Sequence, residues 1–323
     1  MKWRGLTLAL LIACLTFTAG SEQGWQGMKS LPRLPGARLL VGYPPGTLAV
    51  TGPENTWMVA EGTQYLSIYP SLSRDGNLVA ATRVKDIYPM YAAPPMAIAT
   101  YSLSEHKWTE YMTQYEHVQD FEGSIAIAPD GSKLAFAVAD PRVSPRPHMH
   151  VIELTSGAER RFPINGRNSP IQASWSPDGR EIVYDSYPKT NSEGAIIDFS
   201  HELFILNLKT GESRKIANGR SPAWSPSGEW ICHLGPYDAD RAAYGISKIM
   251  LVRPDGTGSR LLRKEKYVGS GPVWSPDSKS ILVSRRRDID KRTEDVKVLN
   301  IATRKVTRIV KGGPPVFGWA EAK

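Results

Sequence analysis

The chain repeats one short pattern five times, and this repeat restricts the fold more than any other feature. Its clearest copy is Ala173 to Ser186, which reads ASWSPDGREIVYDS. The copies at 222–234 and 272–284 keep the Trp-Ser-Pro core, and weaker copies lie at 124–137 and 70–82. The aligned turn positions are separated by 55, 48, 49 and 50 residues. A period of this length indicates a repeat architecture.

Each copy has the features of a β-hairpin. In the clearest copy Pro177 restricts φ, Asp178 can bond to its own backbone, and Gly179 supplies a positive φ. The residues after the turn alternate polar and apolar side chains, as in a half-buried strand. The Trp before the turn offers a large apolar surface. We therefore interpret Trp175, and the equivalent Trp in two other copies, as packing between neighbouring units, and the Asp residues as turn residues rather than catalytic acids.

Each unit continues with an apolar third strand and a short, basic fourth strand. We expect the third strands at 96–102, 148–154, 202–208, 247–253 and 295–301. We expect the fourth strands at 106–112, 158–163, 212–217, 259–264 and 305–311. Lys and Arg protect an exposed sheet edge from pairing with other chains. The repeating unit is thus a four-stranded antiparallel sheet with a charged outer edge.

The two ends of the chain complete one another. The N-terminal part offers three strands, at 37–43, 47–51 and 55–60, without an inner strand before them. The C-terminal part, 314–320, offers a single inner strand with Phe317 at the Trp position. Four-stranded units around an axis form a β-propeller. We predict an all-β, six-bladed propeller over residues 37–323, whose last blade is closed by the N- and C-terminal strands.

Four longer insertions fall between the second and third strands of their units. They are residues 84–95, 139–147, 187–198 and 235–245. Equivalent loops of a propeller emerge on one face of the disc, and binding functions are concentrated in loops. The insertions therefore predict one loop-rich face, unless they are neutral surface elaborations.

The first twenty residues are typical of a secretory signal peptide. A short basic segment precedes an apolar run, Leu6 to Phe17, that is too short to span a bilayer comfortably. Two processing schemes stay open: cleavage before Ser21, or lipidation of Cys14 in a lipobox-like segment. Residues 21–36 then form a linker. These schemes predict a periplasmic or secreted protein, or an outer-membrane lipoprotein that contacts the membrane only through Cys14.

The composition, net charge and cysteine count limit the classes of partner and chemistry expected for this protein. Hydrophobic residues make up 41% and charged residues 22%, which is ordinary for a globular protein. The net charge is +8, but an exported protein is not expected to bind nucleic acid. After processing, Cys232 lacks an intrachain disulfide partner. We interpret it as a small buried residue rather than a nucleophile, because the adjacent His233 points to the opposite face of a strand.

The Trp-Ser-Pro-Asp-Gly hairpins resemble the TolB-type propeller repeat, also described as a WD40-like PD40 repeat. The match is strongest at 175–179, 224–228 and 274–278, and the resemblance covers about residues 37 to 321. It implies a periplasmic propeller like TolB, which binds a peptidoglycan-associated lipoprotein. TolB carries an additional N-terminal domain, which we expect this chain to lack. Similar propellers precede the hydrolase domain of prolyl-oligopeptidase-like peptidases or form lyases with metal at the channel.

Catalytic signatures are not found. The sequence contains no nucleophile elbow of the Gly-x-Ser-x-Gly type, no P-loop and no dinucleotide fingerprint in a βαβ unit. His148 and His150 lie on one face of a predicted strand and offer half of a metal site, but no third ligand is identifiable. We therefore predict no catalytic residue, no metal and no cofactor.

The remaining candidate is the mouth of the central channel. The residues just before the inner strands should gather there: Glu122, Arg167, Arg220, Tyr267 and Lys311, with Gln64 or Tyr65 from the first unit. Three of them are cationic, and such a ring can hold a carboxylate or an acidic partner segment. Alternatively the mouth is merely polar, with Glu122 neutralising the arginines. Arg167 and Arg220, which precede equivalent prolines in neighbouring units, are the strongest candidates.

Two classes of function follow. The first is a monomeric, non-enzymatic binding or scaffold protein of the cell envelope, with an envelope protein or an anionic polymer as partner. The alternative is a hydrolase or lyase that acts on a polysaccharide or lactone at the central channel. The sequence favours the first because no convergent catalytic set is identifiable.

Overall fold

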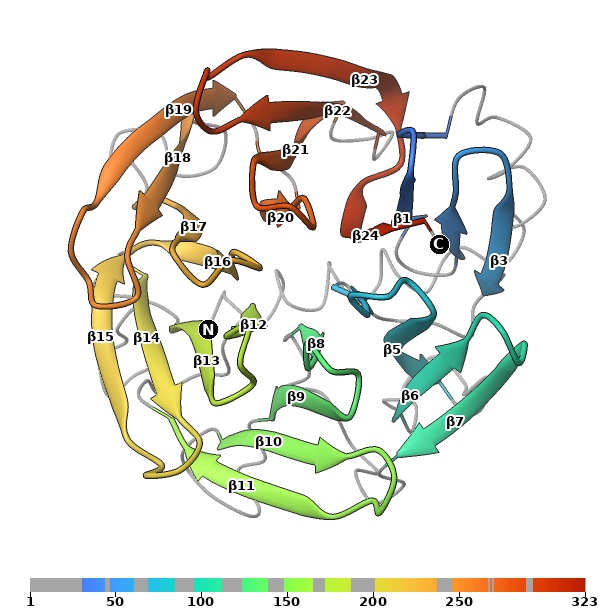
Figure 1. The fold of residues 1–323 in the computed structure, drawn as a ribbon, viewed down its shortest axis with the longest axis vertical. Helices are drawn as coiled ribbons and strands as arrows, with labels where there is room; N and C mark the ends of the chain where they lie inside the picture. The colour runs from blue at the N-terminus through green and yellow to red at the C-terminus, as the bar shows by residue number, and fades with distance from the viewer. Residues whose placement is uncertain are drawn as a thin grey trace, which may run out of the picture.

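The computed structural model describes residues 31–43, 47–60, 69–84, 96–111, 124–138, 148–164, 172–186, 201–236, 246–266, 268, 270–288 and 293–322. Within them, strands β1 to β24 form six four-stranded antiparallel sheets. Figure 1 shows the sheets as blades around a central axis. Among these residues we find no apolar helix of membrane-spanning length. The predicted all-β, six-bladed propeller is confirmed.

The blades are numbered here in chain order, and their strands are given from the axis outward. Blade 1 contains β24 (Val316–Glu321), β1 (Ala37–Tyr43), β2 (Thr47–Thr51) and β3 (Thr56–Ala60). Blade 2 contains β4 (Ser71–Leu72), β5 (Leu78–Val84), β6 (Met96–Ser102) and β7 (Lys107–Tyr111). Blade 3 contains β8 (Ile125–Ile127), β9 (Lys133–Val138), β10 (His148–Glu153) and β11 (Glu159–Pro163).

The other three blades follow the same plan. Blade 4 contains β12 (Ala173–Trp175), β13 (Glu181–Ser186), β14 (Glu202–Asn207) and β15 (Ser213–Asn218). Blade 5 contains β16 (Arg220–Trp224), β17 (Ile231–Leu234), β18 (Ile246–Val252) and β19 (Arg260–Lys266). Blade 6 contains β20 (Val273–Trp274), β21 (Ser280–Asp288), β22 (Thr293–Asn300) and β23 (Val306–Gly313).

The hairpin turns form as the repeat predicts. In blade 4 the Ser176 hydroxyl donates to Asp178 Oδ1 over 2.7 Å, and the Arg180 backbone N–H donates to the same oxygen over 3.1 Å. These bonds, the Ser176 bond first, lower the pKa of Asp178. Gly179 has φ +68°, the left-handed conformation that glycine adopts without strain. Asp178 is therefore a turn residue.

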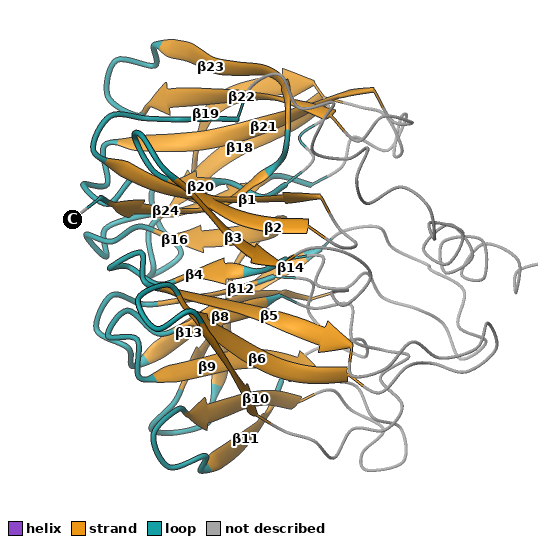
Figure 2. Ribbon diagram, turned by 90° about the vertical axis from the view of Figure 1, so that its right-hand side faces the viewer, coloured by secondary structure: helices purple, strands orange, loops and turns teal. Residues whose placement is uncertain are grey.

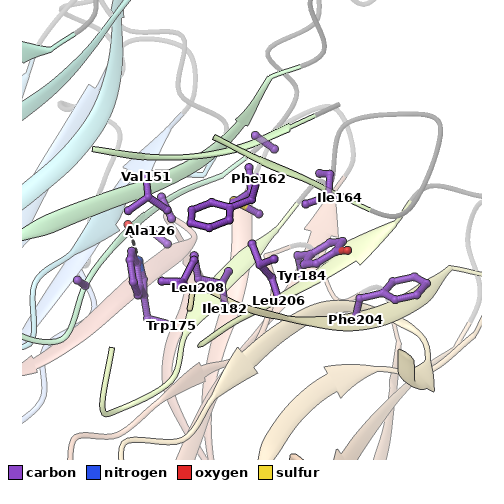
Figure 3. Packing of buried hydrophobic residues seen from close by; sticks show 14 residues of the cluster. Ala126, Val151, Phe162, Ile164, Trp175, Ile182, Tyr184, Phe204, Leu206 and Leu208 are labelled. Atoms are coloured by element: carbon purple, nitrogen blue, oxygen red, sulfur yellow. Dashed lines mark hydrogen bonds between the residues drawn. The ribbon is translucent and has the colours of Figure 1, made fainter. Parts of the chain in front are cut away.

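Tryptophans at the ends of the inner strands pack between neighbouring blades. Trp175 is buried in a cluster that joins blade 3 to blade 4, together with Phe162, Tyr184 and Leu206 (Figure 3). Its indole N–H donates to the carbonyl oxygen of Ala126 in blade 3 over 3.0 Å. Trp224 and Trp274 lie in the clusters that join blade 4 to blade 5 and blade 5 to blade 6, so the predicted inter-unit role of the tryptophans is confirmed.

The ring closes where the sequence predicts, with one correction. β24 pairs antiparallel with β1, Leu39 opposite Trp319 and Leu40 opposite Gly318, and the register then shifts before Val41. Because of this bulge, Phe317 packs with the blade 1–blade 2 cluster and Trp319 with the blade 6–blade 1 cluster. Trp319, rather than Phe317, therefore faces the preceding blade as Trp175 does.

One face of the disc collects the ends of the second strands and the starts of the third strands. Figure 2 shows these strand ends on one side and the tight turns on the other. We call the first side the loop face and the second the turn face. Apart from Val84, Gly235 and Pro236, the four insertions predicted between these strands lie outside the described residues, so their arrangement stays a prediction. The inner strands also begin on the loop face.

Candidate functional site

The structure describes two of the five predicted mouth residues. Arg220 is half-buried and opens β16, the inner strand of blade 5, on the loop face. Lys311 is exposed in β23, the outer strand of blade 6, because that strand continues to Gly313 before the chain turns inward. The two residues therefore lie on an inner and an outer strand. Glu122, Arg167 and Tyr267, and also Gln64 and Tyr65, lie outside the described residues.

A buried carboxylate ties the inner strand of blade 4 to that of blade 5. Asp185, near the end of β13, is fully buried. Its Oδ1 accepts the backbone N–H of Gln172 in its own blade over 2.9 Å. Its Oδ2 accepts the backbone N–H of Ser221 in blade 5 over 3.0 Å. A carboxylate is well suited to this position because it offers only acceptors to two backbone donors.

The backbone that presents Arg220 is unusual. Ser221, the next residue, has φ +55°, and β16 carries a register shift between Arg220 and Ala223. A non-glycine residue in this region costs about 1–3 kcal/mol and persists only when its surroundings hold it. Here the Asp185 bond supplies part of that restraint.

The connection into β16 leaves no room for a side chain. Gly219 alone separates β15 from β16 and has φ +149°. A Cβ there would lie 2.4 Å from His233 Nδ1 and 2.5 Å from the carbonyl oxygen of Leu234. The Gly219 N–H donates to the carbonyl oxygen of His201 over 2.7 Å. This short crossover fixes the position of Arg220 on the loop face.

Two histidines complete this site, which we call the junction cluster: Asp185, His201, Arg220, Ser221 and His233. Burial, with a smaller effect from the charge of Arg220, lowers the pKa of His201 to about 4. Burial lowers the pKa of His233 to about 4 as well, and its Nδ1 lies 3.3 Å from the Leu234 carbonyl oxygen that it bonds. Both imidazoles are therefore neutral at pH 7.

The inner strands come close together at this level of the channel. Gln172 precedes β12 in blade 4, and Gly271 precedes β20 in blade 6, so the whole of blade 5 separates them along the ring. A Cβ on Gly271 would lie 2.5 Å from Gln172 Oε1. The Gln172 side chain therefore reaches from one blade to the next but one, and its backbone N–H bonds Asp185 of the junction cluster.

The other sequence candidates have structural roles. His150 is buried, stacks on Phe136 with ring centroids 5.3 Å apart, and bonds Glu159 through Nδ1. Burial lowers the pKa of His150, and Glu159 opposes this only in part. Cys232 is fully buried, and burial raises the pKa of its thiol. In the described ranges, no three His, Cys, Asp or Glu side chains gather in a group able to hold a metal.

Sequence reasoning missed Asp185, although a signal was present. The residues that occupy its position in the second strands of blades 2, 3, 5 and 6 are Thr82, Ala137, Leu234 and Ser284. A single ionisable side chain at a position that is otherwise apolar or hydroxylic marks a special contact. Aligning the repeats beyond their turns therefore reveals it. Ser221 gives no such signal, because its conformation depends on the bulge.

No protein-family model matches the chain. A dipeptidyl-peptidase 5 from Porphyromonas gingivalis is 26% identical over 238 residues, which cover 71% of this chain and 31% of the relative. The Tol-Pal system protein TolB of Francisella tularensis subsp. tularensis is 23% identical over 257 residues, which cover 64% of this chain and 54% of the relative. The chain thus spans about a third to a half of the length of these relatives.

Among solved structures, TolB from Acinetobacter baumannii superposes with a TM-score of 0.64 at 15% identity. The match covers 88% of this chain and 65% of the other. At this level of identity the likeness concerns the fold. Together with the repeated hairpins and the closed ring of six blades, these similarities show that the chain shares the β-propeller fold of TolB.

Proposed function

We propose that the protein is a non-enzymatic binding protein of the bacterial cell envelope, located in the periplasm, and that its loop face recognises a protein or polymer partner. One observation carries the proposal: a strained backbone segment, restrained by the buried Asp185, presents Arg220 on the loop face at the junction of blades 4 and 5. Such strain gathers at functional sites because folding alone does not select it. The similarity to a Tol-Pal system protein agrees with an envelope role.

The chemistry of Arg220 defines the expected ligand group. A guanidinium presents a planar fork of donors that matches a carboxylate, and partial burial strengthens the pairing. The neighbouring histidines are neutral at pH 7, so they carry no positive charge that would compete with Arg220 for an anion. An acidic side chain or C-terminal carboxylate of the partner is therefore the expected group, with Arg167 as the proposed second cation.

The test compares capture of envelope components by the parent protein and by variants. We expect Arg220→Ala and Arg220→Ala/Arg167→Ala to lose a crosslinked partner, and Arg220→Lys to recover only part of it. Arg214→Ala, an exposed arginine on the outer strand β15, serves as the matched control. Melting temperatures must stay unchanged in all variants. Equal capture by the parent and both alanine variants would contradict the proposal.

The enzymatic alternative has a separate test. A propeller lyase or hydrolase would retain a metal after purification or would turn over substrate. We expect metal analysis of the purified protein to find no stoichiometric cation, and assays on polyuronates, lactones and dipeptidyl substrates to give no turnover. A stoichiometric divalent metal together with turnover would replace the binding proposal with the enzymatic one.

Export is tested in the native host. The protein should be found in the periplasmic fraction, with an N-terminus at Ser21 or at an acylated Cys14. An intact Met1 in the cytoplasmic fraction would contradict the periplasmic location.

A further inference from the structure

The outer strands of blades 5 and 6 concentrate the positive charge of the chain. Residues 260–266 and 304–311 contain eight basic residues and one acidic residue, which gives +7 against a net charge of +8 for the whole chain. All eight are exposed: Arg260, Arg263, Lys264, Lys266, Arg304, Lys305, Arg308 and Lys311. We call this surface the basic rim. Figure 1 shows β19 and β23 following one another on the outer circumference.

Little of this charge is neutralised within the molecule. The one acidic residue, Glu265, is buried and accepts bonds from Lys297 over 2.8 Å and from Arg263 over 3.3 Å. Arg260 lies over the ring of Trp230, 4.7 Å from its centroid. In the part of the chain that the structure describes, the other six basic side chains have no acidic partner within ion-pair distance.

The other blades have different outer edges. In blades 3 and 4, Arg161 pairs with Glu159 and Lys215 with Glu202. The outer strand of blade 1 carries no charged residue, and that of blade 2 carries one lysine and one glutamate. A basic edge that only prevented strand pairing would recur in all six blades. Blades 3 and 4 each carry two basic residues on the outer strand, against the eight of blades 5 and 6, so the positive charge is concentrated in one sector.

Exposed aliphatic side chains lie in the same sector. Ile246 at the start of β18 is 49% exposed, and Leu261 in β19 is 40% exposed. Ile246 pairs in register with Lys266. Among the described residues, the only other large hydrophobic side chain this exposed is Met58. Apolar and basic groups are therefore mixed on one surface.

We propose that the basic rim docks edge-on against a bilayer that contains anionic phospholipids. Lysine and arginine are attracted to negatively charged headgroups, and aliphatic side chains gain by entering the interface between headgroups and acyl chains. A soluble polyanion would use the cations but would gain nothing from Ile246 and Leu261. The mixture therefore fits a membrane surface better than an acidic polymer in solution. The basic rim follows the outer strands, and Ile246 and Lys266 lie at its loop-face end. Arg220 lies on an inner strand, so the two proposals rest on different residues and are tested separately.

The test measures co-sedimentation of the exported, processed protein with lipid vesicles. All forms carry Cys14→Ser so that no acyl chain contributes. We expect binding to vesicles of 30% phosphatidylglycerol in phosphatidylcholine, weaker binding at high salt, and none to pure phosphatidylcholine. The variant Lys264→Gln/Lys266→Gln/Lys305→Gln/Arg308→Gln should bind at least 100-fold more weakly, at about 5-fold per charge.

A matched variant controls for total charge. Arg74→Gln/Lys107→Gln/Arg180→Gln/Lys209→Gln removes four exposed cations elsewhere and should keep vesicle binding within a few-fold of the parent. Ile246→Ser/Leu261→Ser should weaken vesicle binding but leave binding to dextran sulfate unchanged. Equal losses in the two quadruple variants, or serine substitutions without effect on vesicle binding, would overturn the proposal. So would parent protein that binds dextran sulfate but not the vesicles.

Discussion

Single residues show how one turn conformation is kept while its sequence changes. The turn between the third and fourth strands places a residue in the left-handed region in several blades. Gly157 has φ +70° and Gly211 φ +76°, whereas Arg304 has φ +58° in the equivalent turn of blade 6. The backbone N–H of each donates to the carbonyl oxygen four residues earlier. The fold thus imposes this conformation even where the side chain opposes it.

Reciprocal substitutions test this strain. Arg304→Gly should raise the free energy of unfolding by about 1 kcal/mol, because glycine adopts this conformation without a Cβ clash. Gly157→Arg should lower it by a similar amount, since a Cβ at Gly157 meets nothing within 4 Å and only the backbone is strained. Urea denaturation measures both. Changes of the same sign would show that side-chain contacts, and not φ, dominate.

The buried histidines predict a decline of stability in acid. His201 and His233 have folded pKa values of about 4, against about 6.5 in the unfolded chain, so the unfolded state binds protons first as the pH falls. These two histidines should not change the free energy of unfolding above pH 7. They should lower it as the pH falls from 6.5 to 4, and below pH 4 they should lower it no further. For His233 alone the loss between pH 7 and pH 5 is about 2 kcal/mol.

Denaturation curves at several pH values provide the measurement. His201→Gln/His233→Gln should flatten the slope between pH 7 and pH 5, whatever its stability at pH 7. An unchanged slope in the double variant would assign the acid sensitivity to other groups.

At the scale of elements, polar bonds between blades hold the inner strands in place. The Ser124 hydroxyl accepts the backbone N–H of Ala173 over 2.8 Å, and the Ser174 hydroxyl accepts that of Trp224 over 3.0 Å. Asp185 serves the same purpose between blades 4 and 5 with a charged group. Short inner strands have few ladder bonds of their own, so these links supply acceptors for backbone donors that would otherwise be buried unpaired.

Substitution of Asp185 measures this link. Asp185→Asn keeps the shape but places an NH₂ group against one of two backbone donors, and should lower the free energy of unfolding by about 2 kcal/mol. Asp178→Asn is the control, because that carboxylate also accepts two bonds but lies in an exposed turn, and should cost less than about 1 kcal/mol. Equal losses in the two variants would rule out a special role for the buried bridge.

At the scale of the whole molecule, the closure by β24 makes the ring a single unit. β24 supplies the inner strand of blade 1, and both Val316 and Ala320 are buried. Without it, β1 becomes an unpaired edge, and the interfaces on both sides of blade 1 lose apolar contacts. The stability of all six blades therefore depends on a strand from the far end of the chain.

Truncation tests the closure. Deleting residues 313–323 should lower the free energy of unfolding by several kcal/mol, since the strand loses both its ladder and its buried side chains. Deleting only residues 322–323, which follow β24, is the control; it removes one bond, from the Ala322 N–H to the Gly36 carbonyl oxygen, and should cost only about 1 kcal/mol. A 313–323 deletion that melts like the parent would contradict closure by this strand.

The sequence determined the architecture because turns and periodicity are local. The Ser-Pro-Asp-Gly hairpins follow from residues near one another in the chain, and the count of repeats gives the number of blades. The closing strand follows from comparing the two ends of the chain, one with a missing inner strand and the other with a single spare one. The expected polar–apolar alternation after the turn is wrong for β13, where residues 182–186 are all buried because both faces pack against neighbouring blades. The tertiary structure decided what depends on distant segments. Three features join residues of different blades. They are the bulge that places Trp319, rather than Phe317, against the preceding blade, the hydrogen bond from Ser221 to Asp185, and the approach of the Gln172 side chain to Gly271. The same holds for the sector in which the basic side chains gather, since it depends on which outer strands are neighbours around the ring.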